Sequence, residues 1–283
     1  MKNIIKRKIN ICIITLVLIA SCVNSAEWGY ETGEITPDQW GNLHGFETCS
    51  TGNKQSPIDL NQSELSPDLS RVMVTDLPDL YFNYHQSPLD VINNGHTVEF
   101  EYETGSIITL ESGGEAFEIL QFHFHAPAEH SFEQGALYEM EMHIVHRSLS
   151  NPNQLAVVGV MIRQGEHNQV LAPIWDNAAN LLNTGDHVSD HSRYINIDDA
   201  LPSDRRYFSY SGSLTTPPCS EIVEWRILRN PIEMSLEQIS SFISILDNSC
   251  CASNGNNRPI QNLNNREVLL DEENEENEES DDG

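Results

Sequence analysis

The chain of 283 residues carries 43 acidic and 15 basic residues, which gives a formal net charge of −28. A negative field of that size repels phosphate backbones and anionic lipid surfaces, so nucleic acid is excluded as a partner. The length and the hydrophobic share of 39% are typical of a soluble protein with one large domain or two small ones.

The first 26 residues have the pattern of an export signal. A basic start at residues 2–8 precedes the apolar run Ile11–Ala20, and small residues follow. A run of this length is too short to span a bilayer as a helix, so we expect cleavage and no transmembrane segment. Residues Ile19–Cys22 also match a lipoprotein cleavage box. The sequence therefore predicts an exported protein, periplasmic or secreted, with lipid anchoring through Cys22 as the alternative.

Residues 27–268 are predicted to form one domain, because no linker or repeat divides them. Apolar runs bounded by turn residues indicate β-strands in most of this range. The expected strands are Thr97–Tyr102, Ile107–Leu110, Phe117–Phe124, Tyr138–His146 and Leu155–Ile162.

Helices are predicted at two places, Ala172–Leu182 and Leu236–Leu246, where apolar residues recur at helical spacing. The predicted fold class is therefore mainly β, in a single domain with a few helices. Residues 269–283 are mostly acidic, and we expect them to form a disordered tail, because such a segment has little apolar surface to bury.

Four cysteines lie beyond the expected export signal: Cys49, Cys219, Cys250 and Cys251. Four cysteines allow three pairings, and the residues alone do not choose among them. Export to an oxidising compartment permits disulfides of any of these pairings.

Three histidines carry the main chemical signal. His123 and His125 lie two residues apart in one expected strand, so both side chains point to the same face, while Phe122 and Phe124 point to the other. His143 lies in another expected strand, and pairing of the two strands would bring three imidazoles together. A histidine in a strand is often only a satisfied polar residue. Three neutral imidazoles, however, are also the ligand set of a catalytic zinc ion with an open fourth position.

Six short motifs follow one another along residues 28–266: Gln55–Asp59, Asn93–His96, Gln121–His125, Glu129-His130, Glu141–His146 and Gly212–Pro218. In this order they resemble the alpha-class carbonic anhydrases, most closely the bacterial exported members. The resemblance implies a ten-stranded, largely antiparallel twisted sheet with a few peripheral helices. It also implies a zinc-dependent enzyme that hydrates carbon dioxide reversibly to bicarbonate and a proton.

The resemblance further implies a role for each residue of the metal site. One zinc ion per chain is held by His123, His125 and His143, and zinc-bound hydroxide attacks carbon dioxide. Gln121 accepts a hydrogen bond from His123, and Glu141 accepts one from His143, which holds each imidazole in place. A backbone carbonyl near residue 256 supports the remaining ligand.

Four more residues receive catalytic roles from the resemblance. The Thr215 hydroxyl donates to Glu129, so that it accepts from the zinc-bound hydroxide and aims it at the substrate. His96 is the proton shuttle between the site and buffer, because an imidazole exchanges protons near neutral pH. Tyr30 helps to order the chain of water molecules between them.

Carbon dioxide has no net dipole, so it requires an apolar niche. By resemblance this niche is lined by Val145, Val157, Leu214, Val223 and Trp225, with Thr216 on the wall of the cleft. The resemblance also implies a disulfide between Cys49 and Cys219, and it gives Cys250 and Cys251 no role.

Glu99 departs from the pattern, because the best-known family members carry a neutral polar residue there. We expect its carboxylate to raise the pKa of His96 or of the zinc-bound water.

Two other function classes are compatible with parts of the sequence. A binding module on the same fold would have lost zinc histidines, whereas this chain keeps all three. A zinc carrier or acidic surface protein would explain the histidines and the charge, but not the segment Leu214–Pro218. Carbon dioxide and bicarbonate are therefore the expected partners, and the sequence predicts no oligomeric state.

Overall fold

The computed structural model describes residues 28–30, 35–60, 72–132, 137–249, 252 and 254–272. The expected export signal, Cys250 and Cys251 lie outside these ranges. Among the described residues, no helix has both the length and the apolar character that crossing a membrane requires.

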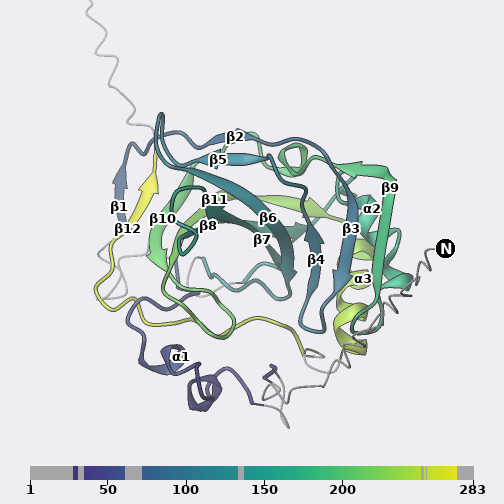
Figure 1. The fold of residues 1–283 in the computed structure, drawn as a ribbon, viewed down its shortest axis with the longest axis horizontal. Coiled ribbons are helices and arrows are strands. Elements are labelled where there is room, and N and C mark those ends of the chain that lie inside the picture. Colours follow the sequence, from purple (N-terminus) through teal and green to yellow (C-terminus); the bar gives the residue numbers. More distant parts are fainter. Residues whose placement is uncertain are drawn as a thin grey trace, which may run out of the picture.

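Twelve strands of the described chain form one twisted sheet (Figure 1). They are β1 (Val72–Thr75), β2 (Tyr81–Asn83), β3 (Ser87–Asn93), β4 (Val98–Glu101), β5 (Ile107–Thr109), β6 (Ala116–His125), β7 (Met140–Ser148), β8 (Leu155–Gln164), β9 (His187–Ile195), β10 (Tyr207–Gly212), β11 (Val223–Met234) and β12 (Val268–Asp271). All five strands expected from the sequence are present, as β4 to β8, with ends that agree or are shifted by at most two residues.

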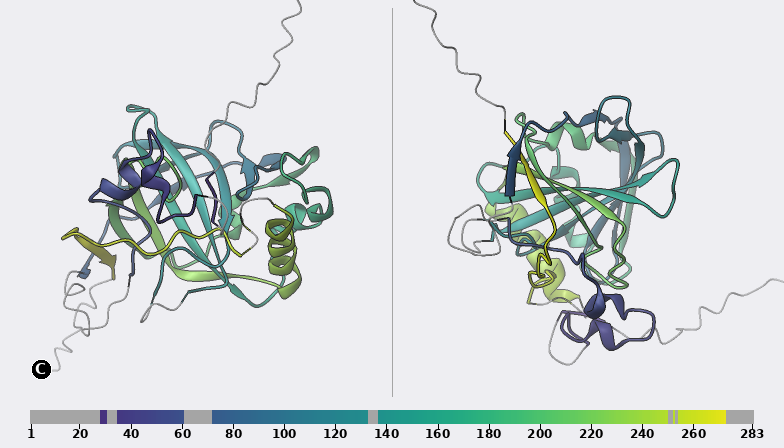
Figure 2. Two further views of the ribbon diagram at one scale, coloured as in Figure 1. Left: turned by 90° about the horizontal axis from the view of Figure 1, so that it is seen from below. Right: turned by 90° about the vertical axis from the view of Figure 1, so that its left-hand side faces the viewer.

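The sheet is mainly antiparallel, as expected. Ten strands follow the order β1-β12-β10-β11-β8-β7-β6-β4-β3-β9, and β2 and β5 pair beside this path. Two neighbouring pairs are parallel, β1 with β12 and β8 with β11. The ten-stranded prediction is thus confirmed for the main path. The strong twist of the sheet is visible from the side (Figure 2).

The helices are short apart from α3 (Leu236–Asn248), which confirms the helix expected there. α1 is Thr48–Thr51 and α2 is Ala172–Trp175, and 3-10 turns lie at Trp40–Asn42, Ala178–Asn180 and Ile197–Ala200.

The single helix expected over Ala172–Leu182 is wrong in its extent. α2 ends at Trp175, and a separate 3-10 turn follows. The Asn177 side chain donates to the Pro173 carbonyl at 2.9 Å, while the Asn177 backbone N–H donates to Ile174 at 3.0 Å. An asparagine that bonds the nearby backbone in this way competes with the helical ladder, so the chain leaves the helix.

The folded domain extends beyond residue 268, where we expected the tail to begin. β12 continues to Asp271, parallel to β1 and antiparallel to β10. Leu270 is fully buried, and this apolar anchor explains why the acidic segment remains in the sheet at its start.

Alternate residues of β6 and β7 face two different hydrophobic clusters. Phe122 and Phe124 belong to the larger cluster, together with Phe242 of α3. Val145 belongs to the smaller cluster, together with Trp225 of β11. Because side chains alternate along a strand, the three histidines of β6 and β7 share the face of the smaller cluster.

We expect Ser235→Ala to lower the free energy of unfolding by about 1 kcal/mol without changing the metal site. Ser235 caps α3: its side chain accepts from the Gln238 N–H, and the Gln238 side chain accepts from the Ser235 N–H. Urea unfolding followed by circular dichroism measures the loss. Ser244→Ala is the matched control, because Ser244 is exposed on the same helix; an equal loss in both variants would contradict the capping assignment.

Candidate metal centre

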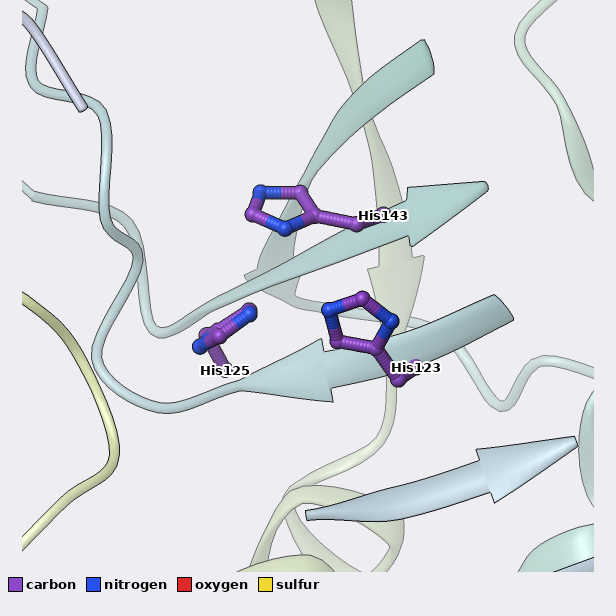
Figure 3. A group of neighbouring side chains, drawn as sticks. All are labelled: His123, His125 and His143. Carbon is purple, nitrogen blue, oxygen red and sulfur yellow. The ribbon is translucent and has the colours of Figure 1, made fainter. Parts of the chain in front are cut away.

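The pairing of β6 with β7 brings three imidazoles together. His123 lies directly opposite His143 in this antiparallel register, and His125 lies two residues further along β6. The three rings approach one another from the two strands (Figure 3), with centroids 4.6 to 5.3 Å apart. One nitrogen of each ring lies within 4.8 Å of the other two, which is a spacing that suits a shared metal ion.

A hydrogen bond orients each of these imidazoles and occupies one of its nitrogens. The pairs are His123 Nδ1 with Gln121 Oε1, His125 Nδ1 with the Asn256 carbonyl and His143 Nε2 with Glu141 Oε1, each at 2.8 Å. Nε2 of His123, Nε2 of His125 and Nδ1 of His143 are left for a ligand. Nε2 of His125 is buried and has no hydrogen-bond partner in the described structure. Three nitrogen donors held in this way fit zinc.

Burial favours the neutral form of two of these ligands. It lowers the pKa of His123 well below its usual value, and the nearby His125 and His143 lower it further. Burial likewise lowers the pKa of His125, against the charge of Glu129. For His143, burial alone would lower the pKa, but the charge and hydrogen bond of Glu141 raise it above its usual value. A neutral imidazole is the form that binds a metal ion.

Glu141 is the centre of a buried hydrogen-bond network. Its carboxylate accepts from His143 and from His130 Nδ1 at 2.7 Å, and from the backbone N–H groups of Glu129 and His130. Burial raises the pKa of Glu141, but the two histidines outweigh it and hold this pKa well below its usual range. His130 Nε2 is in turn hydrogen-bonded to the Tyr210 hydroxyl at 2.6 Å. The polar atoms of this cluster are thus engaged with one another, which favours a supporting network over a second metal site.

Glu129 lies beside His125 and His143, and one of its carboxylate oxygens has no hydrogen-bond partner in the described structure. Its Oε1 accepts from the Arg258 backbone N–H at 2.8 Å. Its Oε2 lies 3.9 Å from His143 Nδ1, is buried, and has no hydrogen-bond partner among the described residues. Thr215 is buried in the loop between β10 and β11, but its expected hydrogen bond to Glu129 is not formed in the described structure. That pairing therefore stays a prediction.

The apolar residues expected to line the substrate niche lie together. One cluster contains Val145, Val157, Val223 and Trp225, with Leu214 packed against it. The register of the sheet explains this, because Val157 pairs with Val145 on one side and with Trp225 on the other. The Trp225 ring lies edge-on to His143 with centroids 4.9 Å apart, so the cluster borders the histidines. Thr216 follows Thr215 in the adjoining loop.

His96 stacks flat on Trp28, with ring centroids 3.8 Å apart and planes 4° from parallel. Tyr30 meets the edge of Trp28 at 5.9 Å, and burial raises the pKa of Tyr30 well above its usual value. Sequence reasoning missed Trp28, and the available signal was an aromatic pair, Trp28 and Tyr30, directly after the expected export signal.

The expected influence of Glu99 on His96 is wrong. The pKa of His96 is lowered, and burial is its cause. Burial instead raises the pKa of Glu99 itself to about 7, assisted by the hydrogen bond and charge of Glu101. Glu99 lies opposite His123 in the pairing of β4 with β6, so it shares the face of the histidines.

The implied disulfide is present between Cys49 and Cys219. It joins α1 to the loop that carries Thr215.

Sequence reasoning also missed Tyr210 and Arg258. A lone arginine inside an uncharged stretch of a strongly acidic chain was the available signal for Arg258.

The chain is similar to carbonic anhydrases over most of its length. The family model described as eukaryotic-type carbonic anhydrase matches residues 35–272. A carbonic anhydrase of Nostoc sp. is 41% identical over 259 residues, covering 88% of this chain and 90% of that protein. A carbonic anhydrase of Klebsiella pneumoniae is 35% identical and covers 91% of this chain and 96% of that protein. The solved alpha-carbonic anhydrase of Thermovibrio ammonificans in complex with the inhibitor sulfanilamide superposes with a TM-score of 0.75 at 36% identity, covering 86% and 99% of the two chains.

We expect Glu99→Gln to stabilise the zinc-free protein at pH 8 by about 2 kcal/mol and to change little at pH 5. The folded pKa is about 7 against an ordinary value of 4.5. Between these two pKa values the folded state keeps a proton that the unfolded state has released, so the free energy of unfolding falls as the pH rises. A glutamine does not titrate, so the variant does not lose this stability. Thermal unfolding of chelator-treated protein at both pH values measures it, with the exposed Glu103→Gln as control. A gain that is equal at pH 5 and pH 8 would contradict the assignment.

Proposed function

Because the chain belongs to the eukaryotic-type, or alpha-class, carbonic anhydrases, we propose that it hydrates carbon dioxide with one zinc ion at His123, His125 and His143. The convergence of three oriented imidazoles, each with one nitrogen left for a ligand, carries the proposal. Zinc bound there lowers the pKa of a water ligand to about 7 and supplies hydroxide at neutral pH, an effect for which carbonic anhydrases are themselves the standard example.

Glu129 and Thr215 orient the nucleophile in this proposal. The unpaired Oε2 of Glu129 is buried, and a buried carboxylate oxygen favours a hydroxyl donor. Thr215 is the donor we assign to it. Because its hydroxyl donates a hydrogen bond to Glu129, the Thr215 oxygen accepts one from the nucleophile, and we assign to the Thr215 backbone N–H the role of stabilising the charge that develops on the substrate oxygen.

The cluster of Val145, Val157, Val223, Trp225 and Leu214 provides the apolar niche for carbon dioxide. Its contact with the ring of His143 supports this role, because the substrate would then lie next to the nucleophile. Proximity of this kind lowers the barrier by removing translational freedom before the reaction.

His96 carries the released proton to buffer. Its ring is partly buried against Trp28, and its Nδ1 has no hydrogen-bond partner in the described structure. The lowered pKa of His96 keeps the imidazole neutral at pH 7, which is the form that accepts a proton.

We also propose that residues 1–26 direct export, to the periplasm or outside the cell, with lipid anchoring through Cys22 as the alternative. The disulfide between Cys49 and Cys219 supports export, because such bonds persist in oxidising compartments. The acidic segment after residue 272 lies outside the described residues, so the expected tail stays a prediction there.

We expect zinc removal to abolish carbon dioxide hydration and zinc addition to restore it. Stopped-flow mixing with a pH indicator measures the rate, and metal analysis gives the zinc content. His143→Ala should lower zinc affinity by more than about 100-fold, because it removes one of three ligands. His44→Ala is the control, since His44 is exposed and far from the site in sequence. A zinc-loaded, folded protein without hydration activity would refute the proposed function.

We expect His96→Ala to slow turnover in weak buffer by about 10-fold, with kcat/KM nearly unchanged. The physical reason is that proton release limits turnover, while substrate conversion does not need the shuttle. Added imidazole should restore the rate in a saturable manner. Turnover that is unchanged in weak buffer, or a loss that imidazole fails to rescue, would remove His96 from the proton path.

A further inference from the structure

Arg258 is a buried arginine next to the proposed nucleophile-orienting pair. Its side chain is 1% exposed, and its guanidinium donates to three neutral oxygens: Gln55 Oε1 at 2.9 Å, the Ser56 carbonyl at 2.8 Å and the Cys49 carbonyl at 2.9 Å. Its Nε is buried without a hydrogen-bond partner in the described structure. A buried cation that is bound only by neutral groups requires a compensating charge nearby.

Glu129 supplies that charge. The same residue, Arg258, donates its backbone N–H to Glu129 Oε1 at 2.8 Å, and Glu129 is itself only 1% exposed. Burial lowers the pKa of Arg258 to about 10, while the charge of Glu129 opposes this shift, so the arginine stays charged at neutral pH. The two buried charges therefore stabilise each other, although no direct salt bridge joins the guanidinium to the carboxylate.

The guanidinium is also connected to the loop that carries Thr215. Gln55, which accepts from Arg258, donates through Nε2 to the Cys219 carbonyl at 3.1 Å. Cys49, whose carbonyl accepts from Arg258, is bonded to Cys219 through the disulfide. Cys219 in turn donates its backbone N–H to Thr216 at 2.9 Å. Arg258 thus contacts Glu129 through its backbone, and its side chain contacts Gln55 and Cys49, which are bonded to the loop of Thr215.

We propose that the Arg258 guanidinium is a positioning group that fixes the buried Glu129 carboxylate, and its charge, against the Thr215 loop. This inference rests on the proposed function, in which Thr215 donates to Glu129. If Arg258 fixes the carboxylate in this way, the site should discriminate between different ligands of the metal. With its proton committed to Glu129, the Thr215 oxygen accepts from ligands that carry a proton, such as a sulfonamide nitrogen, and repels those that carry none, such as azide.

The test compares Arg258→Met, which removes the charge, with Arg258→Lys, which keeps it without the forked donor geometry. Arg266→Met is the matched control. Arg266 is also buried and donates to four backbone carbonyls, including that of Gln55, but its pKa responds to Tyr210 and Glu221 and not to Glu129. Arg258→Met and Arg266→Met therefore share the loss of a buried arginine that donates to backbone carbonyls, and they differ in their relation to Glu129.

Calorimetric titration of the zinc-loaded proteins with azide and with sulfanilamide gives the two dissociation constants. In Arg258→Met we expect azide to bind more tightly and sulfanilamide more weakly, so that the ratio of the azide constant to the sulfanilamide constant falls by about 10-fold or more. In Arg258→Lys the ratio of the two dissociation constants should lie between those of Arg258→Met and the wild type. The zinc content should remain one per chain in all variants, because no metal ligand is changed.

An unchanged ratio in Arg258→Met, or an equal fall in Arg266→Met, overturns the inference, because general loosening weakens both ligands alike. If Arg258→Met folds poorly, Glu129→Gln/Arg258→Met decides: neutralising both charges should raise the unfolding temperature above that of Arg258→Met. A further decrease overturns the coupling. The proposed function is tested separately, since a wild-type protein without zinc-dependent hydration refutes it before any variant is compared.

Discussion

The antiparallel register of β6 on β7 is the constraint on which the rest of the site depends. It sets His123 opposite His143 and leaves His125 two residues further along β6, so two paired strands bring the three imidazoles together. A slip of β6 by one residue would turn His123 and His125 toward the larger hydrophobic cluster and expose Phe122 and Phe124 to the site. The phenylalanines that fill the core therefore also fix the metal ligands.

Around this pair of strands, burial keeps some groups neutral, and hydrogen bonding keeps others charged. The ligands His123 and His125 are kept neutral by burial, whereas Glu141 is kept charged by the histidines that donate to it. A buried carboxylate of this kind is stable only because each of its oxygens accepts hydrogen bonds. Glu129 differs, since its Oε2 is buried without a hydrogen-bond partner in the described structure, and in the proposed function this oxygen accepts from Thr215.

The sequence predicted the strands and the convergence of the three histidines, because both follow from local patterns. The alternation of β6 and the spacing of His123 and His125 are visible in ten residues, and the ordered motifs identified the family. The helix after Ala172 was predicted too long, because a side chain that bonds its own backbone leaves little trace in apolar spacing. The pKa of His96 and the contacts of Arg258 depend on residues far away in the chain, such as Trp28 and Glu129, so no local pattern contained them.

The stack of Trp28 on His96 places the beginning of the folded chain against the proposed path of the proton. Trp28 lies two residues beyond the expected cleavage point. The expected cleavage would therefore take place close in sequence to the residue that stacks on the proposed proton shuttle. If His96 carries the proton as proposed, cleavage that also removed Trp28 would change the surroundings of the shuttle. The same holds for recombinant protein, in which an affinity tag is better attached at the acidic carboxyl-terminal end than at the amino terminus.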